Sequence, residues 1–297
     1  MCSLSPLWAG MDRSGFYLVT LVGLTMTAFA ANSLLARLAL ADGAIDAGSY
    51  TLLRLISGAF VLFVLVSIPR KTGLRQILRQ GHWLSALSLF IYAAGFSYAY
   101  LALDTGMGAL ILFAMVQTTM VGWAIFKGDR PMALEWIGLI TAFGAFFWLV
   151  SPGIQAPDPL GTALMAAAGV AWGVYSLRGR ASTDPLATTA GNFALSVPAA
   201  LLLLVFSIAE ISTSGTGVLL AIMSGGLTSG LGYALWYRVL PHISSTQGAI
   251  VQLTVPVIAA AAGVVFISEP LTWKFMIASV LILGGVALAI VGKSRRA

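Results

Sequence analysis

The chain alternates between long apolar stretches and short polar breaks along its whole length. A helix that crosses a membrane needs about 20 mostly apolar residues. Stretches of this kind occupy residues 16–40, 49–68, 83–103, 106–126, 132–151, 159–179, 187–208, 217–240, 244–267 and 271–292. The breaks contain turn residues such as Asp42-Gly43, and the longest break, 69–82, is too short for a soluble domain. The pattern therefore predicts an all-α integral membrane protein with ten transmembrane helices.

Composition excludes several classes of protein. The 297 residues are 59% hydrophobic and 9% charged, whereas a soluble domain carries about 25% charged residues. An ordinary soluble enzyme and a disordered chain are both excluded. Cys2 is the single cysteine, and His82 and His242 lie in breaks rather than within predicted spans. Because no P-loop pattern is present either, we expect no enzyme activity, no catalytic residue, no metal and no cofactor.

The basic residues indicate how the helices are oriented, because cytoplasmic loops of membrane proteins are enriched in Lys and Arg. With the N-terminus in the cytoplasm, 13 of the 16 basic residues fall at cytoplasmic ends, and Lys274 falls at an outer end. The other two, Arg37 and Arg54, fall inside predicted spans. We expect a multi-pass protein of the bacterial inner membrane with both termini in the cytoplasm. We expect its net charge of +6 to favour contact with anionic lipid and not with nucleic acid.

The ten spans divide into two groups of five. A shift of 140 residues aligns Gly108-Ala109 with Gly248-Ala249 and Gly144 with Gly284. An odd number of helices per repeat inverts the second copy, and the basic breaks of the two halves do exchange sides. Inverted repeats are common in secondary transporters, which bind solute near the membrane midplane between the halves. We predict a cytoplasmic segment at 1–15, repeats at 16–151 and 152–292, and a basic cytoplasmic tail at 293–297. Whether Met1 or Met11 is the native start stays open.

Several short motifs carry a resemblance to a known family. They are Leu53-Arg54-Leu55, Ala171-Trp172-Gly173-Val174-Tyr175, Thr254-Val255-Pro256 and Ser268-Glu269-Pro270-Leu271. These motifs resemble the drug/metabolite transporter superfamily, specifically its ten-helix group built from two EamA-type repeats. The resemblance extends over about residues 16–292 and is strongest to bacterial exporters of amino acids, including aromatic ones. It implies a transporter of such metabolites. The first repeat departs from the family pattern at Val116-Gln117 and at Asp129-Arg130.

The two arginines within spans are functional candidates. A charge inside the membrane costs about 2.5–3.5 kcal/mol on insertion scales unless it is paired or reaches the interface. Arg37 and Arg54 each lie about one turn from the predicted outer end of a helix. Both could extend outward or pair with Asp42 or Asp46. Structural anchoring and a role in an outer vestibule both stay open.

Polar and aromatic side chains near the predicted midplane are candidates for solute binding. Lipid offers no hydrogen bonds, so polar groups there must face other helices or a watery cavity, and deep aromatic rings could stack on a planar solute. The predicted binding residues are Asn32, Tyr92, Gln117, Trp172, Tyr233 and Gln252. Tyr175 and Tyr237 are predicted to lie in the interfacial aromatic belt. Hydrogen bonding between helices and plain core packing are the alternatives for the binding residues.

Small residues and a proline indicate where helices could move against each other. Gly173 and Gly230 each end a Gly-x-x-x-Gly pattern, which permits close approach of two helices. Pro256 removes a backbone hydrogen bond within a predicted span and could kink it. We predict that all three act in gating, with static packing as the alternative.

The acidic residues limit the choice of solute. No Asp or Glu lies near the middle of any predicted span, whereas binding of a proton or an organic cation in the membrane usually uses a buried carboxylate. We therefore expect the protein to carry a neutral or zwitterionic solute by facilitated diffusion or exchange. We also expect it to be a monomer. The leading hypothesis is export of amino acids with aromatic or other bulky neutral side chains. Sugar-phosphate or other metabolite exchange is the alternative, and a membrane-embedded lipid-modifying enzyme is the alternative of another class.

Overall fold

The computed structural model describes residues 13–128, 132–151, 156–179, 182–243, 248 and 251–294. The longer helices are α1 (Arg13–Leu40), α2 (Ala47–Arg70), α4 (Trp83–Ala99), α5 (Thr105–Phe126), α6 (Ala133–Val150), α7 (Pro159–Gly179), α8 (Pro185–Phe206), α12 (Thr254–Ile267) and α13 (Trp273–Ser294). The shorter ones are α3 (Leu74–Gln80), η1 (Ile208–Glu210), α9 (Gly215–Ile222), η2 (Met223–Leu231), α10 (Gly232–Val239) and η3 (Leu240–His242). Residues 1–12 and 295–297, which make up most of the predicted terminal segments, lie outside the described residues.

The all-helical membrane fold predicted from the hydrophobic pattern is confirmed. Eight described segments are long and apolar enough to cross a membrane, and two shorter apolar helices, Trp83–Ala99 and Thr254–Ile267, occupy the third and ninth predicted spans. The eighth span, Gly215–His242, is built from α9, η2, α10 and η3 in succession. The protein is therefore a multi-pass membrane protein.

The break at residues 69–82 contains a helix that the hydrophobic pattern does not predict. Helix α2 ends where Lys71 adopts the left-handed conformation, with φ of 51°, and α3 starts at Leu74. The side chain of Gln76 accepts a hydrogen bond from the Gly73 N–H and satisfies one free donor at the helix start. Ile77 is the buried residue of α3. A seven-residue helix with one buried apolar residue is too short for its hydrophobic periodicity to be recognised in the sequence.

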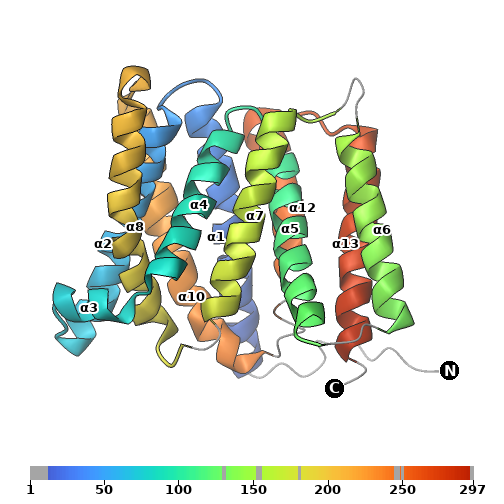
Figure 1. The fold of residues 1–297 in the computed structure, drawn as a ribbon, viewed down its shortest axis with the longest axis horizontal. Coiled ribbons are helices and arrows are strands. Elements are labelled where there is room, and N and C mark those ends of the chain that lie inside the picture. Colours follow the sequence, from blue (N-terminus) through green and yellow to red (C-terminus); the bar gives the residue numbers. More distant parts are fainter. Residues whose placement is uncertain are drawn as a thin grey trace.

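The helices form a slab in which α1 lies near the middle (Figure 1). Helices α2 and α8 pack together at one edge, and α6 packs on α13 at the other edge. Between them, α4 and α5 both pack on α7, while α1 contacts α10, α12 and η2. These seven helical segments therefore meet around the centre of the slab.

The two ends of the slab carry opposite charges. We call one the basic end: α1 begins there, α13 ends there and α3 lies there (Figure 1). We call the other the acidic end, and it carries Asp42, Asp46, Asp104, Asp158, Glu210 and Glu269. Two of these acids have local structural roles: the Asp46 carboxylate accepts a hydrogen bond from Ser49 N at 2.8 Å and so caps α2, and Asp158 accepts one from Gly161 N at 2.6 Å near the start of α7.

Candidate functional site

A cavity of about 460 Å³ lies at the centre of the slab and is lined mainly by α1, α4, α5, α7, η2 and α10, together with residues such as Gln252 outside these elements. This volume is within the range of about 300–1,000 Å³ found for small-molecule sites. All six residues predicted to bind solute line this one cavity: Asn32, Tyr92, Gln117, Trp172, Tyr233 and Gln252. The lining reaches the basic end at Gly179, Ser182, Pro185 and Leu240 but includes no residue of the acidic-end loops. The cavity is therefore a recess that opens toward the basic end.

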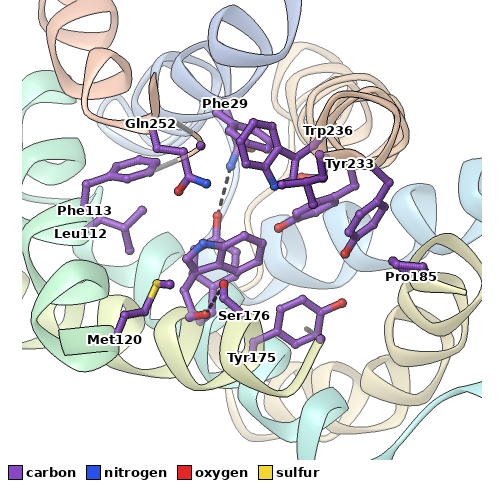
Figure 2. Close-up of a pocket in the computed structure, with 18 of the residues that line it drawn as sticks. Phe29, Leu112, Phe113, Met120, Tyr175, Ser176, Pro185, Tyr233, Trp236 and Gln252 are labelled. Carbon is purple, nitrogen blue, oxygen red and sulfur yellow. Dashed lines mark hydrogen bonds between the residues drawn. The ribbon is translucent and has the colours of Figure 1, made fainter. Parts of the chain in front are cut away.

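Aromatic rings form a continuous wall of the cavity. The ring centroid of Trp172 lies 4.9 Å from that of Tyr92, 5.2 Å from that of Tyr233 and 5.3 Å from that of Tyr175. Figure 2 shows the Tyr175 and Tyr233 side chains projecting into the same hollow from two different helices. Rings at these separations make favourable offset or tilted contacts. They present an apolar surface of tilted rings, against which the ring of a solute can pack.

The prediction that Tyr175 and Tyr237 lie in an interfacial belt is wrong. Both line the cavity, and Tyr175 is buried. The Tyr175 hydroxyl donates to Thr189 Oγ1 at 3.1 Å, and Thr189 Oγ1 lies 2.8 Å from the Tyr237 hydroxyl oxygen. Both residues lie toward the basic end of their helices. The face of the helix that each occupies turns them inward, and this face depends on the neighbouring helices.

Four further aromatic residues of the cavity are absent from the predicted binding residues: Phe29, Phe96, Phe113 and Trp236. Phe29 and Trp236 line it on α1 and α10 (Figure 2). Phe29 precedes Asn32 by three positions, and Trp236 follows Tyr233 by three positions. Because residues three apart share a helix face, this spacing is a signal that could have found both of them. Their rings lie 6.2 Å apart, centroid to centroid.

Asn32 is the centre of a buried polar cluster. Its Oδ1 accepts a hydrogen bond from Ser224 Oγ at 2.6 Å, and Thr228 Oγ1 lies 3.2 Å from the same oxygen. Its Nδ2 donates to the Tyr92 hydroxyl at 3.4 Å. Asn32 is 6% exposed and lines the cavity. The cluster links α1, α4 and η2 through polar groups that would lack hydrogen-bond partners if they faced lipid.

The serine and threonine of this cluster lie on a π-helical segment, η2. A π-helical turn within an α-helix is rare and is often found at functional sites. The segment packs closely on α2: a Cβ at Gly225 would lie 2.0 Å from the Arg54 carbonyl oxygen, and one at Gly230 would lie 3.0 Å from a Val61 methyl group. Glycine is required at position 225 because no side chain fits there. Gly230 thus lies in the contact between η2 and α2.

Of the other two predicted gating residues, Gly173 lies at a helix contact and Pro256 lies near the start of a helix. A Cβ at Gly173 would lie 2.7 Å from the Thr119 Cβ, which places Gly173 at the crossing of α7 and α5. Pro256 lies in the first turn of α12 and not in the middle of a helix, because the helical backbone is interrupted at Leu253. A proline in the first turn lacks only an N–H that has no partner within the helix.

The expected partners of Arg54 are corrected by the structure. Arg54 is 2% exposed and contacts neither Asp42 nor Asp46. Its Nη2 donates to the Tyr92 hydroxyl at 2.8 Å. Its guanidinium carbon lies 4.5 Å from the ring centroid of Phe96 and 5.0 Å from that of Tyr92, within the range of a cation–π interaction. The side chain therefore points toward the cavity wall instead of extending outward.

Arg37 is likewise paired with acids other than those expected. Its Nε lies 3.3 Å from Glu269 Oε1, and its Nη2 lies 3.4 Å from Asp104 Oδ1. The Glu269 carboxylate also accepts hydrogen bonds from Thr105 N at 2.9 and 3.0 Å and from Thr105 Oγ1 at 3.0 Å. Thr105 begins α5, so the carboxylate also neutralises the positive end of that helix dipole. We call Arg37, Asp104, Thr105 and Glu269 the acidic-end latch.

A second contact closes the acidic end beside α2. The Asp46 N–H donates to the Ser212 carbonyl at 2.8 Å, and the Ser214 N–H donates to the Ala44 carbonyl at 2.8 Å. These bonds join the α1–α2 loop to the segment before α9, about 170 positions later in the chain. Together with the acidic-end latch, they connect the two halves of the chain at the end that the cavity does not reach.

Comparison with known proteins identifies the family. Residues 159–291 match the EamA-like transporter family, and the matched segment contains α7, α8, α9, α10 and most of α13. The chain belongs to the EamA-like transporter family. This family is part of the drug/metabolite transporter superfamily, as the sequence motifs indicated.

Relatives of this EamA-like chain cover most of its length. It is 46% identical over 274 residues to an uncharacterized protein of Pseudomonas aeruginosa, and the match covers 92% of this chain and 94% of that one. It is 24% identical over 254 residues to an uncharacterized transporter of Bacillus subtilis, covering 82% and 87% of the two chains. A protein of known crystal structure shares the fold, with a TM-score of 0.64, 20% identity and coverage of 96% and 100%.

Membership of the family supports a role in transport. For an EamA-like transporter, a central recess that opens at one end of the helices is where a solute would bind. The 23 residues that line the recess include no Asp, Glu, Lys, Arg or His within the described part of the chain.

Proposed function

We propose that the protein is a secondary transporter that exports amino acids with aromatic or other bulky neutral side chains across the bacterial inner membrane. The observation that carries this proposal is the recess itself: nine aromatic side chains and three amides line one cavity that is open at one end. Rings can stack on an aromatic or apolar side chain, while amides and hydroxyls bind the polar backbone of an amino acid. The site residues are the six named from the sequence, together with Tyr175, Trp236 and Tyr237.

The proposed direction of transport is export from the cytoplasm. With Lys and Arg enriched in the cytoplasm, the basic end faces the cytoplasm and both termini lie there. A recess open to the basic end and closed by the acidic-end latch is then ready to receive solute from inside the cell. Rocking of the halves would open the latch, close the basic end and release the solute outside. Gly173 and Gly230, which lie at helix crossings, are proposed to permit that movement.

Two inverted five-helix repeats at 16–151 and 152–292 would supply the moving halves of a monomer. The packing of α6 on α13, the last helix of each proposed repeat, supports such a plan. Facilitated diffusion or exchange is the proposed mode, because the described lining contains no carboxylate that could bind a proton. The same lining contains no Lys or Arg, which argues against phosphate binding in a sugar-phosphate exchanger.

Counterflow in proteoliposomes tests the proposal. Vesicles preloaded with unlabelled L-phenylalanine should accumulate external radiolabelled L-phenylalanine, and collapse of the proton gradient should leave this exchange unchanged. Trp172→Ala should raise the half-saturating concentration about 10-fold, because the indole contacts three other rings of the wall. Trp273→Ala is the matched control, since Trp273 is 75% exposed on α13 and lies outside the cavity lining. Uptake that is independent of internal amino acid but driven by internal sugar phosphate would favour the alternative function.

A further inference from the structure

Arg54 carries a buried positive charge without a negative partner. Among the described residues, no carboxylate lies within 4.0 Å of its guanidinium, and its Nη1 has no hydrogen-bond partner. A charge within the membrane that lacks a counter-charge is costly. The two aromatic faces beside it offset part of this cost. An arginine in this position is suited to interact with a negative group that is present only when solute is bound.

Tyr92 separates Arg54 from the cavity and has a single proton to donate. Arginine has no acceptor, so in the 2.8 Å contact the Tyr92 oxygen must accept from Arg54 Nη2. Asn32 Nδ2 approaches the same oxygen at 3.4 Å. The hydroxyl proton must therefore point away from Arg54, and no acceptor for it is found in the described part of the chain. Tyr92 lines the cavity, so the proton is available to a solute.

The contact with Arg54 makes this hydroxyl a strong donor. A hydroxyl that accepts a hydrogen bond from a cation is polarised, and hydrogen bonds in a chain strengthen one another at low dielectric. The natural acceptor for a polarised donor backed by a positive charge is an anionic oxygen. A neutral amide could accept the same proton, but it would gain nothing from the charge of Arg54.

We propose that the Tyr92 hydroxyl, backed by Arg54, is the subsite for the carboxylate of the solute. Arg54 supplies the positive potential without entering the cavity, and Tyr92 makes the contact. The Trp172 ring, 4.9 Å from the Tyr92 ring, then lies where the side chain of an α-amino acid bound in this way would stack. The substrate class is thus narrowed to solutes that combine a carboxylate with an apolar or aromatic group. This inference rests on the proposed function and specifies how its site selects solutes.

The test compares two probes that differ only at the carboxylate, L-phenylalanine and L-phenylalaninamide, by equilibrium binding to the purified full-length protein. Wild-type protein should prefer the acid about 10-fold or more, which is the size of one hydrogen bond to a charged group. Tyr92→Phe keeps the ring and its packing but should reduce this preference to less than about 3-fold. Arg54→Gln should do the same without removing the hydroxyl. Tyr98→Phe is the matched control on the same helix, because Tyr98 does not line the cavity, and it should keep the preference.

The outcomes separate this inference from the proposed function. If neither probe binds to wild-type protein, the proposed function is wrong and the subsite fails with it. If both probes bind equally well, or if Tyr92→Phe keeps the full preference for the acid, amino acids are still ligands but the carboxylate subsite is wrong. Loss of preference in Tyr92→Phe but not in Tyr98→Phe supports the subsite even if Arg54→Gln fails to fold.

Discussion

Removing the charge of Glu269 should open the acidic end. The Glu269→Gln substitution keeps the shape of the side chain but removes its ion pair with Arg37 and weakens its bonds from Thr105. The Glu269 side chain is only 10% exposed, so solvent screens its interactions weakly. Hydrogen bonds to a charged group contribute about 1.5–3 kcal/mol each, roughly twice the value for neutral pairs. We therefore expect the closed state to lose about 2 kcal/mol, which corresponds to about a 30-fold shift toward the open state.

Cysteine labelling from the acidic-end side measures this shift. Phe113 lines the cavity about 12 Å below the start of α5 at Thr105, so Phe113→Cys should be reached from that side only when the latch is open. The native Cys2 is replaced by Ala so that the new thiol is the only one. In right-side-out vesicles, the rate of reaction with a membrane-impermeant maleimide should rise by about 10-fold or more when Glu269→Gln is added.

Asp104, the other carboxylate that pairs with Arg37, supplies the control. The Asp104 side chain is 48% exposed, and an exposed ion pair contributes only about 0–1 kcal/mol. Asp104→Asn should therefore change the labelling rate less than about 5-fold. An unchanged rate in Glu269→Gln would refute the latch, and equal effects of the two substitutions would show that burial of Glu269 does not determine its contribution.

Two further predictions concern stability. Gly285→Ala should lower the free energy of unfolding by about 1–3 kcal/mol, because its Cβ would lie 2.6 Å from the Gly138 carbonyl oxygen. Gly284→Ala is the control and should leave stability unchanged, because no atom lies within 4 Å of its Cβ. Similar melting temperatures for the two variants would contradict the α6–α13 contact. Arg70→Gln breaks an ion pair with Asp184 but should change stability by less than about 1 kcal/mol, because the Arg70 side chain is 46% exposed. A larger loss of stability in a thermal melt would show that solvent screens this pair less than its exposure indicates.

The sequence alone determined the number and approximate ends of the apolar helices, because a lipid environment imposes length and composition on each one separately. It also determined which residues are candidates for solute binding, since a polar or aromatic group at mid-span must face protein or a cavity. Asn32, Tyr92, Gln117, Trp172, Tyr233 and Gln252 meet in one cavity for this reason. Positions three residues from these, such as Phe29 and Trp236, follow from helical periodicity.

Only the tertiary structure decided which groups meet across helices. The partner of Arg37 is Glu269, 232 positions away, and not the nearby Asp42 or Asp46. Arg54 contacts Tyr92 on a different helix, and Tyr175 faces inward because its neighbours turn that face toward the cavity. Helix rotation and pairing depend on packing against several helices at once, so no single segment contains this information. The periodicity of a helix determines which side chains share a face, and only its neighbours determine what that face meets.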